Sequence, residues 1–70
     1  MKHVKMEAFH DGEMWCARGL KDDIFTQGET YDQLLENIKE VVTLHFEEEI
    51  ENGEKIDVMV MSELEIDSVA

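Results

Sequence analysis

The longest periodic pattern in the chain runs from Thr30 to Ile50 and predicts one amphipathic helix. Its apolar residues recur every three or four positions, the spacing that gathers them on one face of a helix. Thr30 is a good N-cap, Gln33 is placed to complete a capping box, and Asn52-Gly53 supplies the stop. The stripe needs cover from the rest of the chain, and its members are Tyr31, Leu34, Leu35, Ile38, Val41, Val42 and His45.

Four shorter segments around this helix have strand patterns. Residues 4–9 alternate in polarity, Asp11-Gly12 is a strong hairpin signal, and residues 14–17 form the return strand. A third strand is predicted at residues 24–27 and a fourth from about Ile56 to Leu64. The order strand, strand, strand, helix, strand predicts a small α+β domain that spans residues 1–70, a four-stranded sheet with the helix packed on one face.

A two-residue turn at Asp11-Gly12 sets the predicted pairing of the first two strands. It would place Ala8 opposite Trp15 and Met6 opposite Ala17, on a side of the sheet without charges that we assign to the helix. A bulge in the turn would reverse this assignment for the second strand. The other side, left uncovered, should be apolar and rich in methionine, which is typical of contact surfaces, and it comprises Phe9, Met14, Cys16, Met59 and Met61.

Composition adds a strong charge bias to this picture. Eighteen acidic and six basic residues give a formal net charge of −12, which disfavours nucleic acid and anionic membranes and favours a basic protein partner. Plain solubility is the alternative explanation. The single cysteine excludes an internal disulfide and suits a reducing cytoplasm, and no apolar run has the length of a membrane span.

The acidic residues are densest where the predicted helix ends. Negative charge at a helix C-terminus opposes the macrodipole, at a cost of about 0.3–1 kcal/mol per residue. Two interpretations stay open: a docking patch for a cationic partner, or an exposed last turn kept soluble by its charge. The residues concerned are Glu47, Glu48, Glu49 and Glu51.

The sequence predicts no catalytic, cofactor-binding or metal-binding residue. His3 and His10 have opposite parity along one strand, and His45 continues the helix stripe, so the histidines do not converge with Cys16 on one metal. Cys16 is expected opposite Glu7, where a carboxylate would raise the thiol pKa and leave it unreactive.

The residues from Thr26 to Glu40 carry a resemblance to a known family. The run Thr26-Gln27-Gly28-Glu29-Thr30, followed by a helix that contains Leu35-Glu36-Asn37-Ile38-Lys39-Glu40, resembles the N-terminal domain of HicB-type antitoxins. That resemblance implies a β-β-β-α-β module with a partial RNase H-like fold, whose last strand lies parallel to the first. The loop before the third strand differs from the family's proline-containing loop, since it reads Arg18-Gly19-Leu20-Lys21-Asp22-Asp23.

The resemblance also implies a function, the binding and blocking of HicA, a small basic toxin that cleaves mRNA. Full-length family members add a C-terminal DNA-binding domain, which these 70 residues lack, so direct nucleic-acid binding is not expected. Self-association into a dimer or higher oligomer is expected because so small a chain buries little core. The alternatives are a homo-oligomeric module with an unknown ligand, or a minimal metal-dependent nuclease. The nuclease would need carboxylates that converge on two metal ions, and Glu7 is expected to point away from Glu36 and Glu40.

Overall fold

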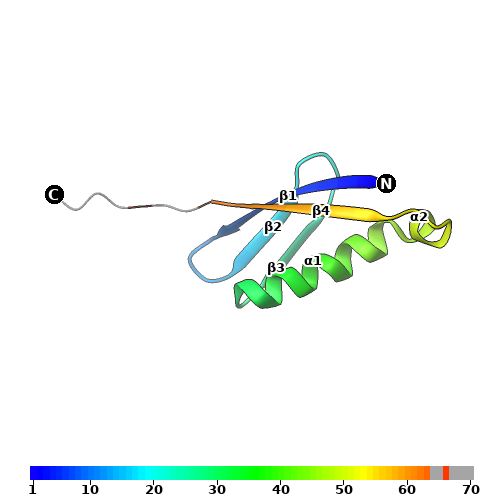
Figure 1. Cartoon of the computed structure of the whole chain (residues 1–70). Coiled ribbons are helices and arrows are strands. Elements are labelled where there is room, and N and C mark those ends of the chain that lie inside the picture. The colour runs from blue at the N-terminus through cyan, green and yellow to red at the C-terminus, as the bar shows by residue number, and fades with distance from the viewer. Residues whose placement is uncertain (64–65, 67–70) are drawn as a thin grey trace.

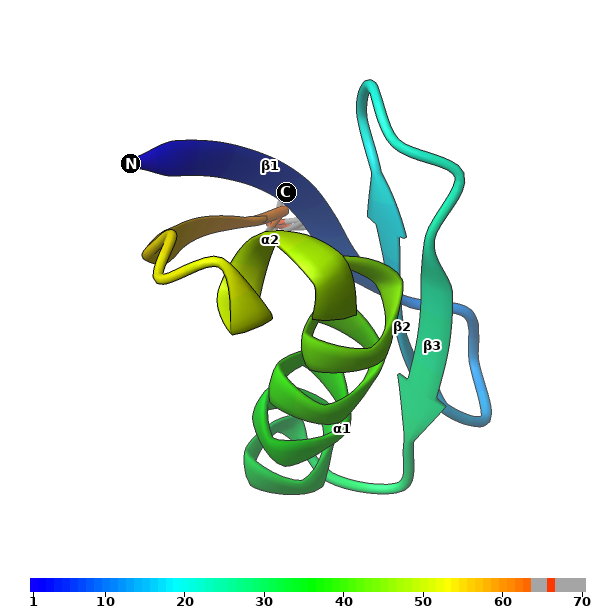
Figure 2. The same cartoon turned by 90° about the vertical axis from the view of Figure 1, so that its right-hand side faces the viewer.

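The computed structural model describes residues 1–63 and 66, and it confirms the α+β class (Figure 1). Four strands form one sheet in the order β3-β2-β1-β4, and α1 packs against one face (Figure 2). The elements in chain order are β1 (Lys2–His10), β2 (Trp15–Gly19), β3 (Phe25–Gly28), α1 (Tyr31–His45), α2 (Glu47–Glu51) and β4 (Ile56–Ser62).

The sheet is mixed. β1 pairs antiparallel with β2, β2 pairs antiparallel with β3, and β4 runs parallel to β1 from Lys2↔Ile56 to Ala8↔Ser62. The chain reaches β4 through α1 and α2, as a crossover between parallel strands requires. The parallel last strand implied by the family resemblance is therefore present. Leu64, the predicted end of that strand, lies outside the described residues.

The predicted hairpin register is wrong by two residues. Ala8 pairs with Ala17 and His10 with Trp15, because the turn is centred on Gly12 and Glu13 rather than on Asp11 and Gly12. Asp11 Oδ1 accepts hydrogen bonds from the N–H groups of Glu13 (2.9 Å) and Met14 (2.8 Å), and Gly12 takes the positive φ of 105°. An even shift preserves side-chain parity, so the predicted helix-facing side is correct.

Both ends of the helical region are capped as the sequence predicts. Thr30 Oγ1 accepts from the Gln33 N–H at 3.1 Å, while the Gln33 side chain accepts from the Glu29 N–H at 2.6 Å, one residue before the expected capping-box partner. Gly53, at φ 85°, ends the second helix in a Schellman motif. In that motif its N–H bonds to the Ile50 carbonyl and the Glu54 N–H bonds to the Glu49 carbonyl.

The single long helix of the prediction is broken at Phe46. Phe46 adopts φ −109° and ψ 32°, which separates α1 from α2, and its buried ring continues the stripe at the i+4 spacing from Val42. Lys2 Nζ lies 4.8 Å from the centre of this ring. The prediction that His45 continues the stripe is wrong, because burial of a phenyl ring is more favourable than burial of an imidazole. His45 is exposed, with its ring edge-on to Phe46.

The core lies between α1 and the central strands. Each of the buried helix residues Leu34, Ile38 and Val42 belongs to the predicted stripe. They meet strand residues that alternate along β1 and β2, the period-2 pattern of a sheet face. Tyr31, Leu35 and Val41 are half-buried around them, and the strand residues are Val4, Met6, Ala8 and Ala17. Neither of the described helices is long and apolar enough to cross a membrane.

Candidate protein-interaction surfaces

The outer surface of the helical layer is strongly acidic. Nine acidic residues and one basic residue lie between Glu29 and Glu54, which places −8 of the chain's −12 there. The one basic side chain, Lys39, is already paired with Glu36 at 3.2 Å. A surface of this charge attracts cationic proteins over the Debye length of about 8 Å at physiological salt.

An exposed leucine lies within this acidic surface. Leu44 is 66% exposed and projects from the last turn of α1, one turn after Glu40. The surface next to it is a shallow depression whose other lining residues are Glu36, Lys39, Glu40 and Thr43. An apolar side chain surrounded by charge has the composition of an interface centre with a polar rim. Leu44 lies outside the buried stripe, so the apolar periodicity of the helix does not single it out.

The acidic residues predicted as a docking patch occupy a different place from the one expected. Glu47, Glu48 and Glu49 form the first turn of α2, not the last turn of a long helix. Negative charge is favourable at a helix N-terminus, so the predicted electrostatic penalty does not arise for these three residues. Glu47, Glu48 and Glu51 are exposed, and Glu49 is half-buried.

The face of the sheet opposite α1, here called the open face, carries mixed side chains. Met59 (54% exposed) and Met61 (39%) lie on it as predicted, and so does half-buried Phe9, but Met14 belongs to the turn. Charged residues separate these apolar groups. Arg18 pairs with Glu7 at 3.4 Å, and His3 lies 3.4 Å from Asp57. The open face is therefore close to neutral, in contrast with the helical layer.

The side chains considered for chemistry lie apart. His3 is on the open face, His10 is beside Trp15 at the hairpin, and His45 is on the helical layer. Among the described residues, no group of three or more histidine, cysteine or acidic side chains is arranged to hold a metal ion. Glu7 faces away from the layer that holds Glu36 and Glu40.

The predicted pairing of Cys16 with Glu7 is wrong, since Cys16 lies opposite Phe9. Its buried Sγ is instead 3.6 Å from Asp11 Oδ2 and 3.7 Å from the Gln27 amide nitrogen. The hydrogen bonds that Asp11 accepts from the Met14 and Glu13 N–H groups lower the pKa of its carboxyl below the usual 3.8.

Comparison with family models, curated proteins and solved structures finds no match to this chain.

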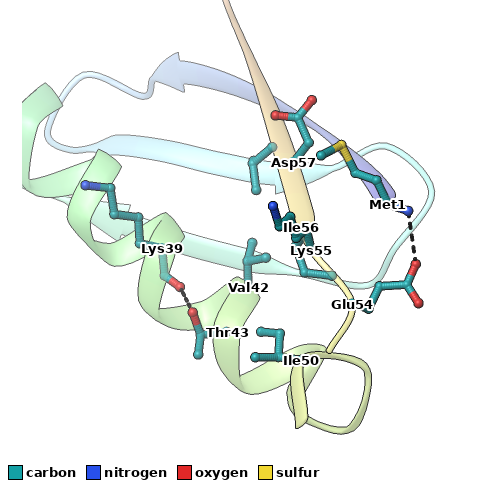
Figure 3. Close-up of a pocket in the computed structure, with 10 residues that line it drawn as sticks. Met1, Lys39, Val42, Thr43, Ile50, Glu54, Lys55, Ile56 and Asp57 are labelled. Atoms are coloured by element: carbon teal, nitrogen blue, oxygen red, sulfur yellow. Dashed lines mark hydrogen bonds and ion pairs between the residues drawn. The ribbon is translucent and has the colours of Figure 1, made fainter. Parts of the chain in front are cut away.

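A groove with an apolar lining lies between the helices α1 and α2 on one side and β4 on the other (Figure 3). At one end Val42, Ile50 and Ile56 line a pocket, and the Met1 amino group pairs with Glu54 at 3.5 Å beside it. At the other end the pocket lining passes to Leu35, Ile38, Val58 and Val60. Ile56, Val58 and Val60 are each only half-buried, whereas the core residues Val4, Met6 and Ala8 of β1 are fully buried. The layer of helices thus leaves β4 partly uncovered.

Proposed function

We propose that this chain is a non-enzymatic, protein-binding antitoxin module of the HicB type, acting in the cytoplasm. Its partner would be a small, basic, mRNA-cleaving toxin of the HicA type. The observation that carries the proposal is the acidic helical layer, net −8 between Glu29 and Glu54, with Leu44 exposed within it. The resemblance of residues 26–40 to the antitoxin family supplies the identity of the partner.

The acidic side chains and Leu44 would have separate roles in the proposed interface. The carboxylates of α1 and α2 would raise the association rate with a basic partner, an effect that salt weakens. Leu44 would supply the desolvated contact at the centre, which mainly sets the dissociation rate. Such an interface blocks an RNA-cleaving protein directly, because the basic surface that binds phosphates is the surface that acidic side chains attract.

The direct test asks whether a small basic protein is encoded beside this chain and uses that protein as the partner. We expect the two proteins to copurify when they are coexpressed, and the RNA cleavage of the basic protein to stop when this chain is added. The complex should weaken as salt rises from about 0.05 M to about 0.5 M. An adjacent basic protein that cleaves RNA equally well with and without this chain would refute the proposal, as would a locus that encodes no such protein.

Two variant pairs localise the contact. Leu44→Ala should weaken the complex about tenfold or more, while Leu20→Ala, another exposed leucine (47%) in the loop after β2, should leave it unchanged. The double variant Glu48→Lys/Glu51→Lys should slow association, and Glu13→Lys/Asp23→Lys, with the same change in net charge outside the helical layer, should slow it much less. Equal effects within each pair would place the contact elsewhere.

A further inference from the structure

The outer edge of β4 presents a row of backbone groups that no other described strand pairs with. Among residues 1–63 and 66, β4 is the last strand of the sheet and pairs only with β1. Lys55 accepts from the Lys2 N–H at one end of this pairing, and the Glu63 N–H donates to Ala8 at the other. Because inward and outward groups alternate along a paired strand, the odd-numbered residues 55–63 bond to β1. The N–H and C=O groups that point outward belong to Ile56, Val58, Val60 and Ser62.

The opposite edge of the sheet is shorter and partly occupied. β3 has four residues, and the bond from the Gly19 N–H to the Ile24 carbonyl fixes its alternation, so only Phe25 and Gln27 point outward. The Gln27 carbonyl already accepts a hydrogen bond of 2.6 Å from the Asn37 side chain. Of the two edges, β4 is therefore the one open to the addition of another strand.

The position of α1 explains why β4 is left open. α1 approaches the sheet closely at Gly28 in β3, where a Cβ atom would meet the backbone of Leu34. Helix and sheet diverge from there toward β4 (Figure 2), which leaves a groove of about 370 Å³. Leu35, Ile38, Val58 and Val60 form its apolar lining, and charged side chains of α1 form its rim.

We propose that a second copy of this chain occupies the β4 edge, with the two β4 strands antiparallel about a two-fold axis at Met59. This register aligns all seven residues of each strand and pairs every outward N–H and C=O group with one of the other copy. It sets Val58 against the second copy's Val60 on the groove side. An isologous contact of this kind closes on itself as a dimer.

Charge complementarity selects both the occupant and the register. With the axis at Met59, Lys55 lies opposite the second copy's Glu63, and Asp57 lies opposite Met61, so two opposite-charge pairs form and no like charges face one another. A shift of two residues in one direction sets Asp57 against the second copy's Glu63, and a shift in the other direction separates Lys55 from the second copy's Glu63. The edge is thus complementary to itself, unlike the acidic helical layer.

This pairing makes an eight-stranded sheet with both α1 helices on the same side. The two acidic layers then repel each other across the axis, with Asp32 and Glu36 of each copy at the rims of the grooves. Salt screens that repulsion, so the dimer should tighten as ionic strength rises. Binding of a basic toxin has the opposite salt dependence, so the dimer and the proposed function can succeed or fail separately.

The test is sedimentation of the whole chain at concentrations up to about 1 mM, in about 0.05 M and about 0.5 M NaCl. We expect a monomer–dimer equilibrium whose dissociation constant is at least about threefold lower at the higher salt. A protein that remains monomeric at the highest concentration in both buffers would overturn the proposal. So would a dimer that tightens as salt is removed.

Met59→Glu, with Phe25→Glu as its matched control, tests whether the β4 edge is the dimer interface. Both residues are apolar, about equally exposed (54% and 55%) and on edge strands of the open face, and each lies beside a basic residue of the neighbouring strand, Lys5 or Arg18. Only Met59→Glu brings two carboxylates together at the proposed axis. It should weaken the dimer at least about tenfold while Phe25→Glu leaves it unchanged. Equal effects would refute β4 as the interface.

Two further variants test the register. Met59→Cys should form an intermolecular disulfide under mild oxidation, because facing residues at non-hydrogen-bonded antiparallel positions have Cα atoms about 4.5 Å apart. Met61→Cys, which would face Asp57, should crosslink far less. Lys55→Glu and Glu63→Lys should each weaken the dimer, and the two together should restore it. Efficient crosslinking through position 61 alone, or no restoration in the double variant, would contradict the axis at Met59.

Discussion

Gly28→Ala tests the contact that holds α1 against the sheet. Gly28 is buried at the end of β3, and an added Cβ would lie 2.5 Å from Leu34 N and 2.9 Å from Leu34 Cα. These neighbours are backbone atoms of the first turns of α1, so they cannot rotate away as a side chain could. Normal carbon contacts of about 3.5–4.0 Å would require the start of α1 to move by about 1 Å.

The cost of that movement has two parts. Overpacking of a well-packed site costs about 1–3 kcal/mol. Displacement of the helix start also strains the Thr30 cap, which is worth about 1 kcal/mol. The sum, about 2–4 kcal/mol, is a large share of the roughly 4–10 kcal/mol expected for 70 residues. At about 4–8 °C per kcal/mol, Gly28→Ala should lower Tm by roughly 8–32 °C.

The assay is thermal unfolding followed by far-UV circular dichroism and by the fluorescence of Trp15, at one fixed protein concentration because association shifts apparent stability. Gly53→Ala is the control. Gly53 also has a special backbone conformation, φ 85°, but nothing lies within 4 Å of an added Cβ, so only a conformational cost of about 1–2 kcal/mol is expected. A Gly28→Ala protein as stable as the Gly53→Ala protein would refute the close approach of α1 to β3.

Three further predictions concern the core, the helix cap and the turn. Met6→Ala, at a fully buried position, should cost about 2–5 kcal/mol in denaturant unfolding, whereas Met61→Ala on the open face should cost under about 1 kcal/mol. Thr30→Ala should cost about 0.5–2 kcal/mol, and a Thr30→Ser variant that retains most of the stability would attribute the loss to the hydroxyl cap. The pKa of Asp11 is lowered in the folded state, so its stabilisation is complete above pH 3.8 and is lost as pH falls through the folded pKa. The stability difference between the wild type and Asp11→Asn, which keeps one acceptor oxygen, should shrink below pH 3.8, and a difference that grows there would contradict the sign.

The sequence predicted the elements and their faces well, because periodicity depends on local residue types. Three members of the apolar stripe of the helix, Leu34, Ile38 and Val42, are core residues, and the side of β1 that carries Met6 and Ala8 faces α1. The hairpin register was predicted wrongly, because it depends on more than local residue types. A turn centred on Gly12-Glu13 shifts the register by two residues, and the hydrogen bonds that the Asp11 carboxylate accepts from the Glu13 and Met14 N–H groups favour it, which is a detail of the folded turn.

The end of the helix and the candidate surfaces were harder to predict. A continuous helix makes His45 and Phe46 equally good next members of the stripe on spacing alone, and the larger apolar burial of Phe46 decides between them. Residues 47–49 were therefore expected at the C-terminus of one long helix, where acidic charge is unfavourable. They lie instead in the first turn of α2, where it is favourable. The open edge of β4 depends on the strand order and on the position of α1 above the sheet. The periodicity of apolar residues predicts neither of these.

Amide hydrogen exchange along β4 shows whether the helical layer covers one face of the sheet and leaves the β4 edge open. At low protein concentration, the amides of Asp57, Met59 and Met61, which bond to β1, should be protected, and those of Val58 and Val60 should exchange rapidly. At high concentration and salt, Val58 and Val60 should gain protection as the second copy pairs with them. Uniform protection along β4 at the lowest concentration, or no gain at the highest, would contradict the account.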